Sequence, residues 1–281
     1  MKMENILVIG GTGKTGRKVA QQLQALGQNV RIGSRSASPA FDWHNPSTWP
    51  AALEGMDKVY VTFQPDLAFP GARDAIEALV RQAQQSNVKK MVLLSGKGER
   101  EAELCEQIVI NSALDYTIVR ASWFNQNFSE NFFLEPILAG HVALPQAEAK
   151  IPYVDTDDIA DVVVESLTND QHNGQIYELT GPELLTFPEV IDEIARVTGR
   201  NIQFTPISQK DYDQMLEEYN LPKDYIWLIN YLFTEVLGNP DIHNVTHDIE
   251  QVLGRKPKSF AQYASETAAT GVWQPQVSTF V

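Results

Sequence analysis

The chain has 281 residues, 43% of them hydrophobic, which is enough for one large α/β domain or for a main domain with a smaller lobe. Its formal net charge of -14 argues against binding to nucleic acid or to an anionic membrane surface, because no basic excess exists to release counterions. The single cysteine, Cys105, excludes a disulfide framework and a multi-cysteine zinc site. No apolar run approaches the ~20 residues of a membrane span, and the first strand begins too early for a signal peptide. We therefore expect a cytoplasmic monomer or homodimer.

The first apolar run, residues 6–10, breaks into a glycine-rich turn, after which Val19, Leu23 and Leu26 recur at helical spacing. A strand, a glycine turn and a helix in this order favour nucleotide binding, although any tight turn can use glycine. Gly13 would let the backbone approach a pyrophosphate, Gly16 would let the helix pack close to the strand, and the helix N-terminus would attract the anion. The turn is too short for a loop that wraps a triphosphate. The residues assigned to this cradle are Gly10, Thr12, Gly13, Lys14, Thr15 and Gly16.

The second expected strand, residues 29–34, ends without an acidic residue. In NAD-binding versions of this unit an acid usually follows the strand and binds the ribose hydroxyls. Here the positions are Ser34, Arg35 and Ser36. A guanidinium flanked by hydroxyls suits the 2′-phosphate of NADP(H), which it can hold through charge-assisted hydrogen bonds. We therefore predict NADPH as the cofactor, with a solvated surface arginine as the alternative.

Apolar strands and amphipathic helices then alternate along the chain. The expected strands are residues 41–43, 58–63, 88–94 and 116–120, and the expected helices are residues 72–85 and 101–111. This alternation predicts an α/β fold with a doubly wound parallel Rossmann sheet. Ligands of such sheets bind at the carboxyl ends of the strands. The further cofactor contacts predicted on this ground are Asp42, Trp43, Thr62, Phe63, Gln64, Ser95 and Gly96.

The later part of the chain lacks the regular alternation of strands and helices and has local patterns of its own. We expect a cofactor domain over residues 1–150, a smaller α/β lobe over 151–264 that is interleaved with it, and an extended tail over 265–281. Within the lobe, Thr186 and Glu189 form a capping-box pattern that opens a helix ending near Gly199. The aromatic segment 224–237 is expected to be core or a subunit contact, with a substrate-pocket role as the alternative.

Several other polar residues could suggest catalysis or metal binding, but we expect them to have no chemical role. The acidic run 155–158 precedes an apolar helix pattern, so we interpret it as a helix N-cap and expect no metal. His243 and His247 lack the acid of a zinc-binding helix, and we expect both at the surface. Cys105 has no neighbouring cation and is expected to be inert.

The candidates for catalysis are Ser95 and Lys97, which follow the expected strand at 88–94. Ser95 could reach the nicotinamide ribose or the substrate, and a strand-end cap is the alternative. Lys97 could bind a ribose or donate a proton, but a solvated loop lysine is the favoured interpretation.

Together these motifs resemble the NmrA-like atypical short-chain dehydrogenases, and most of all the agroclavine and festuclavine dehydrogenase family of ergot-alkaloid reductases. The resemblance extends to about residue 264 and implies an NADPH-dependent reductase that acts on a C=N bond of a small molecule, without implying an ergot substrate. The segments that carry it are Gly10-Gly11-Thr12-Gly13, Gly33-Ser34-Arg35-Ser36, Phe41-Asp42-Trp43 with Trp49, Tyr116-Thr117-Ile118-Val119-Arg120, Trp123-Phe124-Asn125-Gln126-Asn127-Phe128, Ile151-Pro152-Tyr153-Val154, Asp157-Asp158-Ile159-Ala160 and Gly181-Pro182-Glu183-Leu184-Leu185-Thr186.

Typical short-chain dehydrogenases use a tyrosine acid and a lysine four residues later, and alignment places these positions at Gly98 and Ala102. A ketone needs such an acid because its reduction leaves an alkoxide, whereas hydride addition to an iminium gives a neutral amine directly. We therefore predict hydride transfer to an iminium or a similarly activated acceptor. The residues expected to line the substrate pocket and stabilise its cation are Trp123, Phe124 and Asn127. The alternatives are an NADP(H)-sensing regulator without turnover, which the resemblance also suggests, and a quinone or enone reductase.

Overall fold

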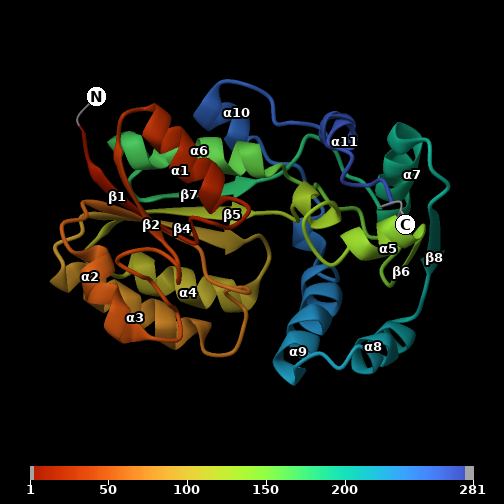
Figure 1. The fold of residues 1–281 in the computed structure, drawn as a ribbon, viewed down its shortest axis with the longest axis horizontal. Helices are drawn as coiled ribbons and strands as arrows, with labels where there is room; N and C mark the ends of the chain where they lie inside the picture. Colours follow the sequence, from red (N-terminus) through yellow and green to blue (C-terminus); the bar gives the residue numbers. More distant parts are fainter. Residues whose placement is uncertain (1–2, 276–281) are drawn as a thin grey trace, which may run out of the picture. The chain divides into compact units, whose positions relative to one another are not determined.

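The computed structural model describes residues 3–275, which form two compact units. The first, here called the sheet unit, combines the described residues up to 121 with residues 156–179 and 247–255. The second, here called the C-terminal unit, combines residues 122–155 and 180–246 with the described residues from 256 onward. This division differs from the expected boundary at residue 150, because the chain leaves the sheet unit after Ala121 and returns to it twice (Figure 1).

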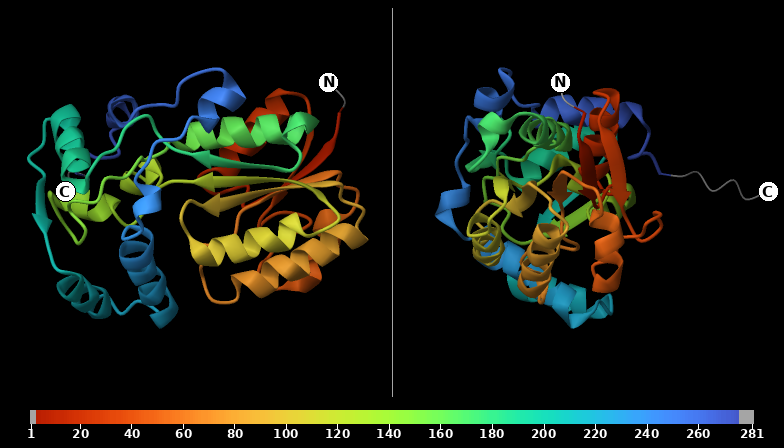
Figure 2. Two further views of the ribbon diagram at one scale, coloured as in Figure 1. Left: turned by 180° about the vertical axis from the view of Figure 1, so that it is seen from behind. Right: turned by 90° about the vertical axis from the view of Figure 1, so that its left-hand side faces the viewer.

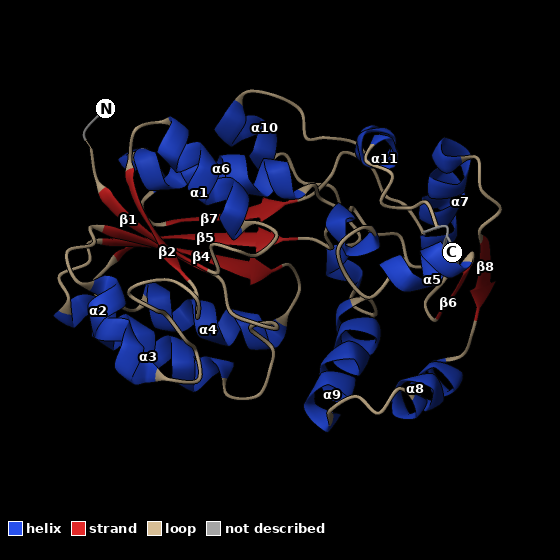
Figure 3. Ribbon diagram, viewed as in Figure 1, coloured by secondary structure: helices blue, strands red, loops and turns tan. Residues whose placement is uncertain are grey.

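The sheet unit is built on six parallel strands in the order β2-β1-β3-β4-β5-β7 (Figure 3). All four residues of β3 are buried, as expected for a strand covered on both faces. The arrangement confirms the predicted doubly wound sheet. The strands are β1 (Asn5–Ile9), β2 (Asn29–Gly33), β3 (Lys58–Val61), β4 (Lys90–Gly96), β5 (Asp115–Ala121) and β7 (Gln175–Leu179).

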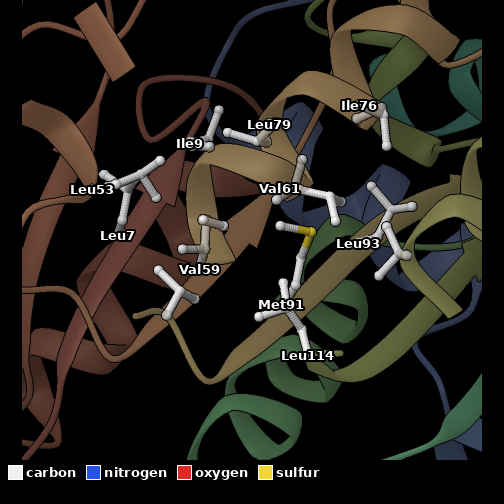
Figure 4. Close-up of a cluster of buried hydrophobic side chains, with 14 of the residues drawn as sticks. Leu7, Ile9, Leu53, Val59, Val61, Ile76, Leu79, Met91, Leu93 and Leu114 are labelled. Atoms are coloured by element: carbon white, nitrogen blue, oxygen red, sulfur yellow. The ribbon is translucent and has the colours of Figure 1, made fainter. Parts of the chain in front are cut away.

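Six helices cover the two faces of this sheet. Helices α1, α6 and α10 lie on one face and α2, α3 and α4 on the other (Figures 1 and 2). Helix α3, for example, turns an apolar stripe with Ile76, Leu79 and Val80 toward the strands. The core between strands β1, β3 and β4 and the layer of helices α2, α3 and α4 includes Leu7 and Met91 (Figure 4). The helices are α1 (Gly16–Ala25), α2 (Trp49–Leu53), α3 (Ala72–Gln85), α4 (Arg100–Ile110), α6 (Thr156–Thr168) and α10 (Asp248–Leu253).

The strand expected at residues 41–43 is absent from the described chain, where this segment is a loop. The aromatic residues of this segment pack against each other. The rings of Phe41 and Trp49 stack with centroids 5.6 Å apart, and the Trp49 indole N–H donates to the Asp42 carbonyl at 2.8 Å. Ring packing and side-chain donors therefore satisfy this segment without a neighbouring strand.

The C-terminal unit surrounds an aromatic core that includes Phe128, Phe133, Phe187 and Phe233. Its two short strands, β6 and β8, pair in parallel. The expected capping box opens α7, where Thr186 Oγ1 and the Glu189 carboxylate each bond the other residue's backbone N–H. The elements are α5 (Leu134–Ala139), β6 (His141–Leu144), α7 (Phe187–Thr198), β8 (Gln203–Pro206), α8 (Gln209–Glu218), α9 (Lys223–Tyr231) with a π turn at 232–236, and α11 (Phe260–Ala269).

The predicted extended tail is wrong for its described part. Helix α11 continues to Ala269, and Trp273 beyond it is fully buried, with its indole N–H donating to the Phe128 carbonyl at 2.8 Å. The large ring supplies apolar burial that helical periodicity does not reveal. Residues 276–281 of the expected tail lie outside the described residues. Over the part of the chain that the structure describes, no helix has the length and apolarity needed to cross a membrane.

Candidate cofactor site

The turn between β1 and α1 is a tight backbone loop in which a side chain would clash at Gly10 and Gly16 and would be crowded at Gly13. Gly10 has φ +73°, and its carbonyl accepts a hydrogen bond from the Gly13 N–H at 2.8 Å. A Cβ added at Gly16 would lie 2.2 Å from the Gly10 carbonyl oxygen, and one at Gly13 would lie 3.2 Å from it. A Cβ at Gly10 itself would meet Thr62 Oγ1 at 2.0 Å. The missing side chains therefore let the loop, α1 and the end of β3 approach closely, as a phosphate cradle requires.

The start of α1 is suited to an anion. Its first turn contains no acidic residue, and the Thr15 side chain makes no capping hydrogen bond there. The Thr15 hydroxyl is buried and accepts a hydrogen bond from the Tyr60 hydroxyl at 2.9 Å, so it anchors the loop to β3. Thr12 is exposed, and Gly13 and Lys14 are partly exposed beside it. The positive end of the helix dipole is thus presented beside accessible loop residues.

Arg35, just beyond β2, differs from the other arginine of this region. Arg31 donates to the Ala52 and Glu54 carbonyls at 2.9 and 2.8 Å and so caps the end of α2. Arg35 is exposed, and no partner for its guanidinium occurs among residues 3–275. The hydroxyls of Ser34 and Ser36 beside it are 3.3 Å apart. This donor set matches the requirements of a 2′-phosphate, and the assignment of these three residues stays a prediction.

The residues expected after β3 lie together with the loop at 41–43. The Trp43 indole N–H donates to the Thr62 carbonyl at 3.2 Å, and its ring lies 4.8 Å from that of Phe63 between centroids. Gln64 is exposed, with its amide nitrogen 3.8 Å from where a Gly13 Cβ would stand. Asp42 Oδ1 instead accepts from the His44 N–H at 3.0 Å, which occupies that oxygen within its own loop.

At the carboxyl end of β4, Ser95 and Gly96 are followed by charged residues that the fold pairs with distant partners. The Ser95 hydroxyl donates to Glu106 Oε1 at 2.6 Å, and the Arg120 Nη2 donates to the other oxygen of this carboxylate at 2.7 Å. The hydrogen bond with Glu106 raises the pKa of Arg120. Ser95 therefore stabilises a buried ion pair, which supports the alternative of a structural cap.

The favoured interpretation of Lys97 as a solvated loop lysine is wrong. Its side chain is 4% exposed, and its Nζ lies 3.2 Å from Glu178 Oε2 on β7. The partner comes from a strand far along the sequence, so no local pattern around Lys97 could reveal it. Gly98 and Ala102, the positions where typical short-chain dehydrogenases have tyrosine and lysine, carry neither group, and Ala102 is fully buried.

Glu99 is the residue of this region that the sequence did not single out. It is 8% exposed, and a Cβ added at Gly96 would lie 1.9 Å from its Oε1, so its side chain folds back over the end of β4. Burial raises the pKa of Glu99 well above its ordinary value, and the negative charge and hydrogen bond of Asp66 raise it further, with a smaller effect of Glu106. The only local signal was an acid in a glycine-rich loop.

The predicted substrate wall, Trp123, Phe124 and Asn127, belongs to the C-terminal unit, and all three residues are partly exposed. The Trp123 ring packs edge-on against Phe233, with centroids 5.4 Å apart. Phe124 forms a bridge with Val154. These contacts hold the segment in place, and its role toward a substrate stays a prediction.

The acidic run forms the start of α6 rather than an ion-binding cluster. Asp157 and Asp158 lie in the first turn of the helix and pair with Lys18 and Arg255, in the latter case at 2.6 Å. Within the described residues no group of three or more His, Cys, Asp or Glu side chains could hold a metal. Cys105 is fully buried, and this burial raises its pKa to about 12, which keeps the thiol protonated and unreactive.

The two expected surface histidines differ. His247 is exposed, whereas His243 is partly buried and its Nδ1 lies 2.6 Å from the Lys150 carbonyl oxygen. A distant backbone partner therefore draws His243 toward the interior.

Comparison with known proteins agrees with this geometry. Residues 10–170 match the NAD(P)H-binding family, and residues 100–266 match the NmrA-like family. The chain is 30% identical to an NAD(P)H azoreductase of Xenophilus azovorans and 29% identical to the festuclavine dehydrogenase of Aspergillus fumigatus, in each case over 94% of this chain and 98% of the relative. An Escherichia coli NADPH-dependent quinone oxidoreductase, solved with NADPH, superposes with a TM-score of 0.75 at 18% identity, covering 93% of this chain and 99% of that one.

Proposed function

The chain belongs to the NmrA-like family of NAD(P)H-binding proteins, and from this premise we propose that it is an NADPH-dependent reductase of small, electron-poor acceptors such as iminium ions. The observation that carries the proposal is the arrangement of residues at the carboxyl ends of β1 and β2. There a glycine-rich turn opens α1, and Arg35, whose guanidinium has no partner among the described residues, follows β2. One of the two relatives described above is named an azoreductase and the other a festuclavine dehydrogenase, and the solved protein that shares the fold is named a quinone oxidoreductase. Azo compounds and quinones accept hydride readily.

Each part of this edge has a task in binding the cofactor. The loop of Gly10, Gly13 and Gly16 would admit the pyrophosphate, and the α1 dipole would stabilise its charge. Arg35, with Ser34 and Ser36 beside it, would bind the 2′-phosphate. The bound dinucleotide supplies a hydride, and the protein's contribution is to hold the acceptor carbon against it and exclude water.

Gly98 and Ala102 stand where typical short-chain dehydrogenases have a tyrosine and a lysine, and this favours acceptors whose reduction needs little help from an acid. Hydride addition to an iminium discharges a cation and leaves a neutral amine, so no proton has to arrive in the same step. The partly exposed Trp123, Phe124 and Asn127 would form the wall that stabilises the cation through their ring faces and amide dipole.

The test is NADPH oxidation measured against a panel of cyclic iminium ions, quinones, azo compounds and simple aldehydes. We expect the highest kcat/KM with iminium ions and the lowest with the simple aldehydes. Gly13→Val protein is the control for oxidation that does not depend on the cradle. Tight NADPH binding without turnover on any acceptor would contradict the proposal and favour an NADP(H)-sensing regulator.

A further inference from the structure

Glu99 lies at the carboxyl end of β4, where its carboxyl group is buried and the charge and hydrogen bonding of Asp66 raise its pKa. Asp66 lies in the loop after β3 and is partly exposed, whereas Glu99 lies in the loop after β4 and is nine-tenths buried. Glu99 Oε2 has no hydrogen-bond partner within the described chain. A buried carboxyl oxygen without a partner is costly for the ionised form, so the geometry favours a group that keeps a proton.

The charges around this pair favour the same state. Of the neighbouring acids at this edge, Glu106 pairs with Arg120 and Glu178 pairs with Lys97. Across residues 3–275, Glu99 itself makes no ion pair with a lysine or arginine. The groups that act on it are Asp66 from the loop after β3 and Glu106 from α4, both of which carry negative charge. Two adjacent carboxyl groups without a cation hold one proton between them.

We propose that the Asp66–Glu99 pair stores the proton for acceptors whose reduction leaves an anion, above all quinones. Glu99 follows Gly98, the position of the absent tyrosine acid, by one residue. The pair therefore offers a proton at the part of the sheet edge where typical short-chain dehydrogenases have theirs, from a different residue. The inference rests on the proposed reductase function and extends its range of acceptors.

The proton balance of the step is simple. A quinone that receives a hydride, and with it two electrons, becomes a hydroquinone anion with one charged oxygen. The O–H bond of Glu99 breaks, the partly exposed Asp66 passes the proton on, and an O–H bond forms at the charged oxygen. Water then returns one proton to the two carboxylates. An iminium acceptor ends neutral and leaves the pair unchanged.

The first test examines the proton without any cofactor. Infrared spectra of the apoprotein at neutral pH should contain the C=O stretching band of a protonated carboxylic acid, and Glu99→Gln should remove it. Raising the pH should also remove it, because the protonated form is lost as the pH passes the pKa of the pair. Glu77→Gln, which changes an exposed glutamate on α3, is the matched control and should keep the band. Absence of the band from the unmodified protein would overturn the inference.

The second test compares two acceptors in single-turnover reactions at saturating NADPH. Glu99→Gln should lower the rate with a quinone about 100-fold and leave the rate with a preformed iminium unchanged. In the unmodified protein only the quinone rate should fall as the pH rises. Asp66→Asn should also slow the quinone reaction, because an amide cannot pass the proton on, and the remaining rate should fall at lower pH, because the charge that raises the pKa of Glu99 is gone.

The outcomes separate the two proposals. If Glu99→Gln slows both acceptors equally, or neither, the carboxyl pair is structural and the inference fails while the reductase function stands. If the unmodified protein reduces no acceptor, the proposed function fails, and the role of the pair in proton supply fails with it. The Asp66→Asn shift keeps the inference open to refutation where Glu99→Gln protein does not fold.

Discussion

The turn after β1 and the carboxyl end of β4 lie at the same edge of the sheet, but they are built in opposite ways. The turn is made of backbone, and its properties come from side chains that are missing at Gly10, Gly13 and Gly16. The end of β4 is made of side chains, and Ser95 and Lys97 are fixed there by partners from other elements. A backbone cradle tolerates little added volume, whereas the loss of one charge from a network of side chains costs more stability the more deeply its partner is buried.

The cradle should be the most sensitive part of the molecule. We expect Gly13→Val to weaken NADPH binding at least about 100-fold, because the new side chain fills the place of the pyrophosphate. Titration calorimetry measures the change. Gly27→Ala is the control: Gly27 also has positive φ but faces open space, so its replacement should cost about 1 kcal/mol of stability and no affinity. Equal affinity of Gly13→Val and unmodified protein would show that the cradle does not bind phosphate.

The next effect concerns stability at the end of β4. Arg120→Leu leaves the fully buried Glu106 carboxylate without its cation, and we expect a loss of about 3–5 kcal/mol in the free energy of unfolding. Denaturant titration measures it. The matched variant Arg81→Leu breaks an exposed pair with Glu77 on α3 and should change stability by no more than about 0.5 kcal/mol. Similar losses in both variants would remove the distinction between buried and exposed charges.

Arg35→Asp should have a smaller but qualitative effect. Loss of the charge-assisted hydrogen bonds to the 2′-phosphate is worth about 1.5–3 kcal/mol, or roughly 10–100-fold in NADPH affinity. The new carboxylate can bind the ribose hydroxyls, so NADH should become the preferred cofactor. Titration of each variant with both dinucleotides measures the ratio, and Arg81→Asp serves as the control. Equal affinity of the unmodified protein for both dinucleotides would refute the assignment of Arg35.

Lys97→Ala should have the smallest effect on chemistry. With a preformed iminium at saturating NADPH, the hydride step should change by no more than about twofold, because no proton is needed. Stability should fall modestly, since the substitution removes the ion pair of Lys97 with Glu178 at 3.2 Å, while Glu178 keeps its contact with Arg120 at 3.5 Å. Lys97→Met, which keeps the buried volume, distinguishes lost packing from lost charge. A large loss of turnover in both variants would identify Lys97 as a proton donor and contradict the acid-free reaction.

The same contrast explains what the sequence predicts. The strand, turn and helix around Gly10 are local patterns, and α3 lies at residues 72–85 as its periodicity predicts. The sheet follows from the alternation of such elements. By contrast, the burial of Lys97 depends on Glu178, and the properties of Glu99 depend on Asp66, and neither partner is near in sequence. The prediction of an extended tail was wrong for the same reason, because nothing near Trp273 in the sequence shows that it is buried against Phe128.

The division of the sheet unit into three chain segments has a consequence for how the protein is made. Strand β7 and helix α10 come from residues 175–179 and 248–253, so the sheet unit remains incomplete until most of the chain has left the ribosome. Before then β5 presents an unpaired edge of apolar residues, which is prone to association with other chains. We therefore expect the nascent protein to need more protection of this edge during synthesis than a protein with a contiguous nucleotide-binding domain would.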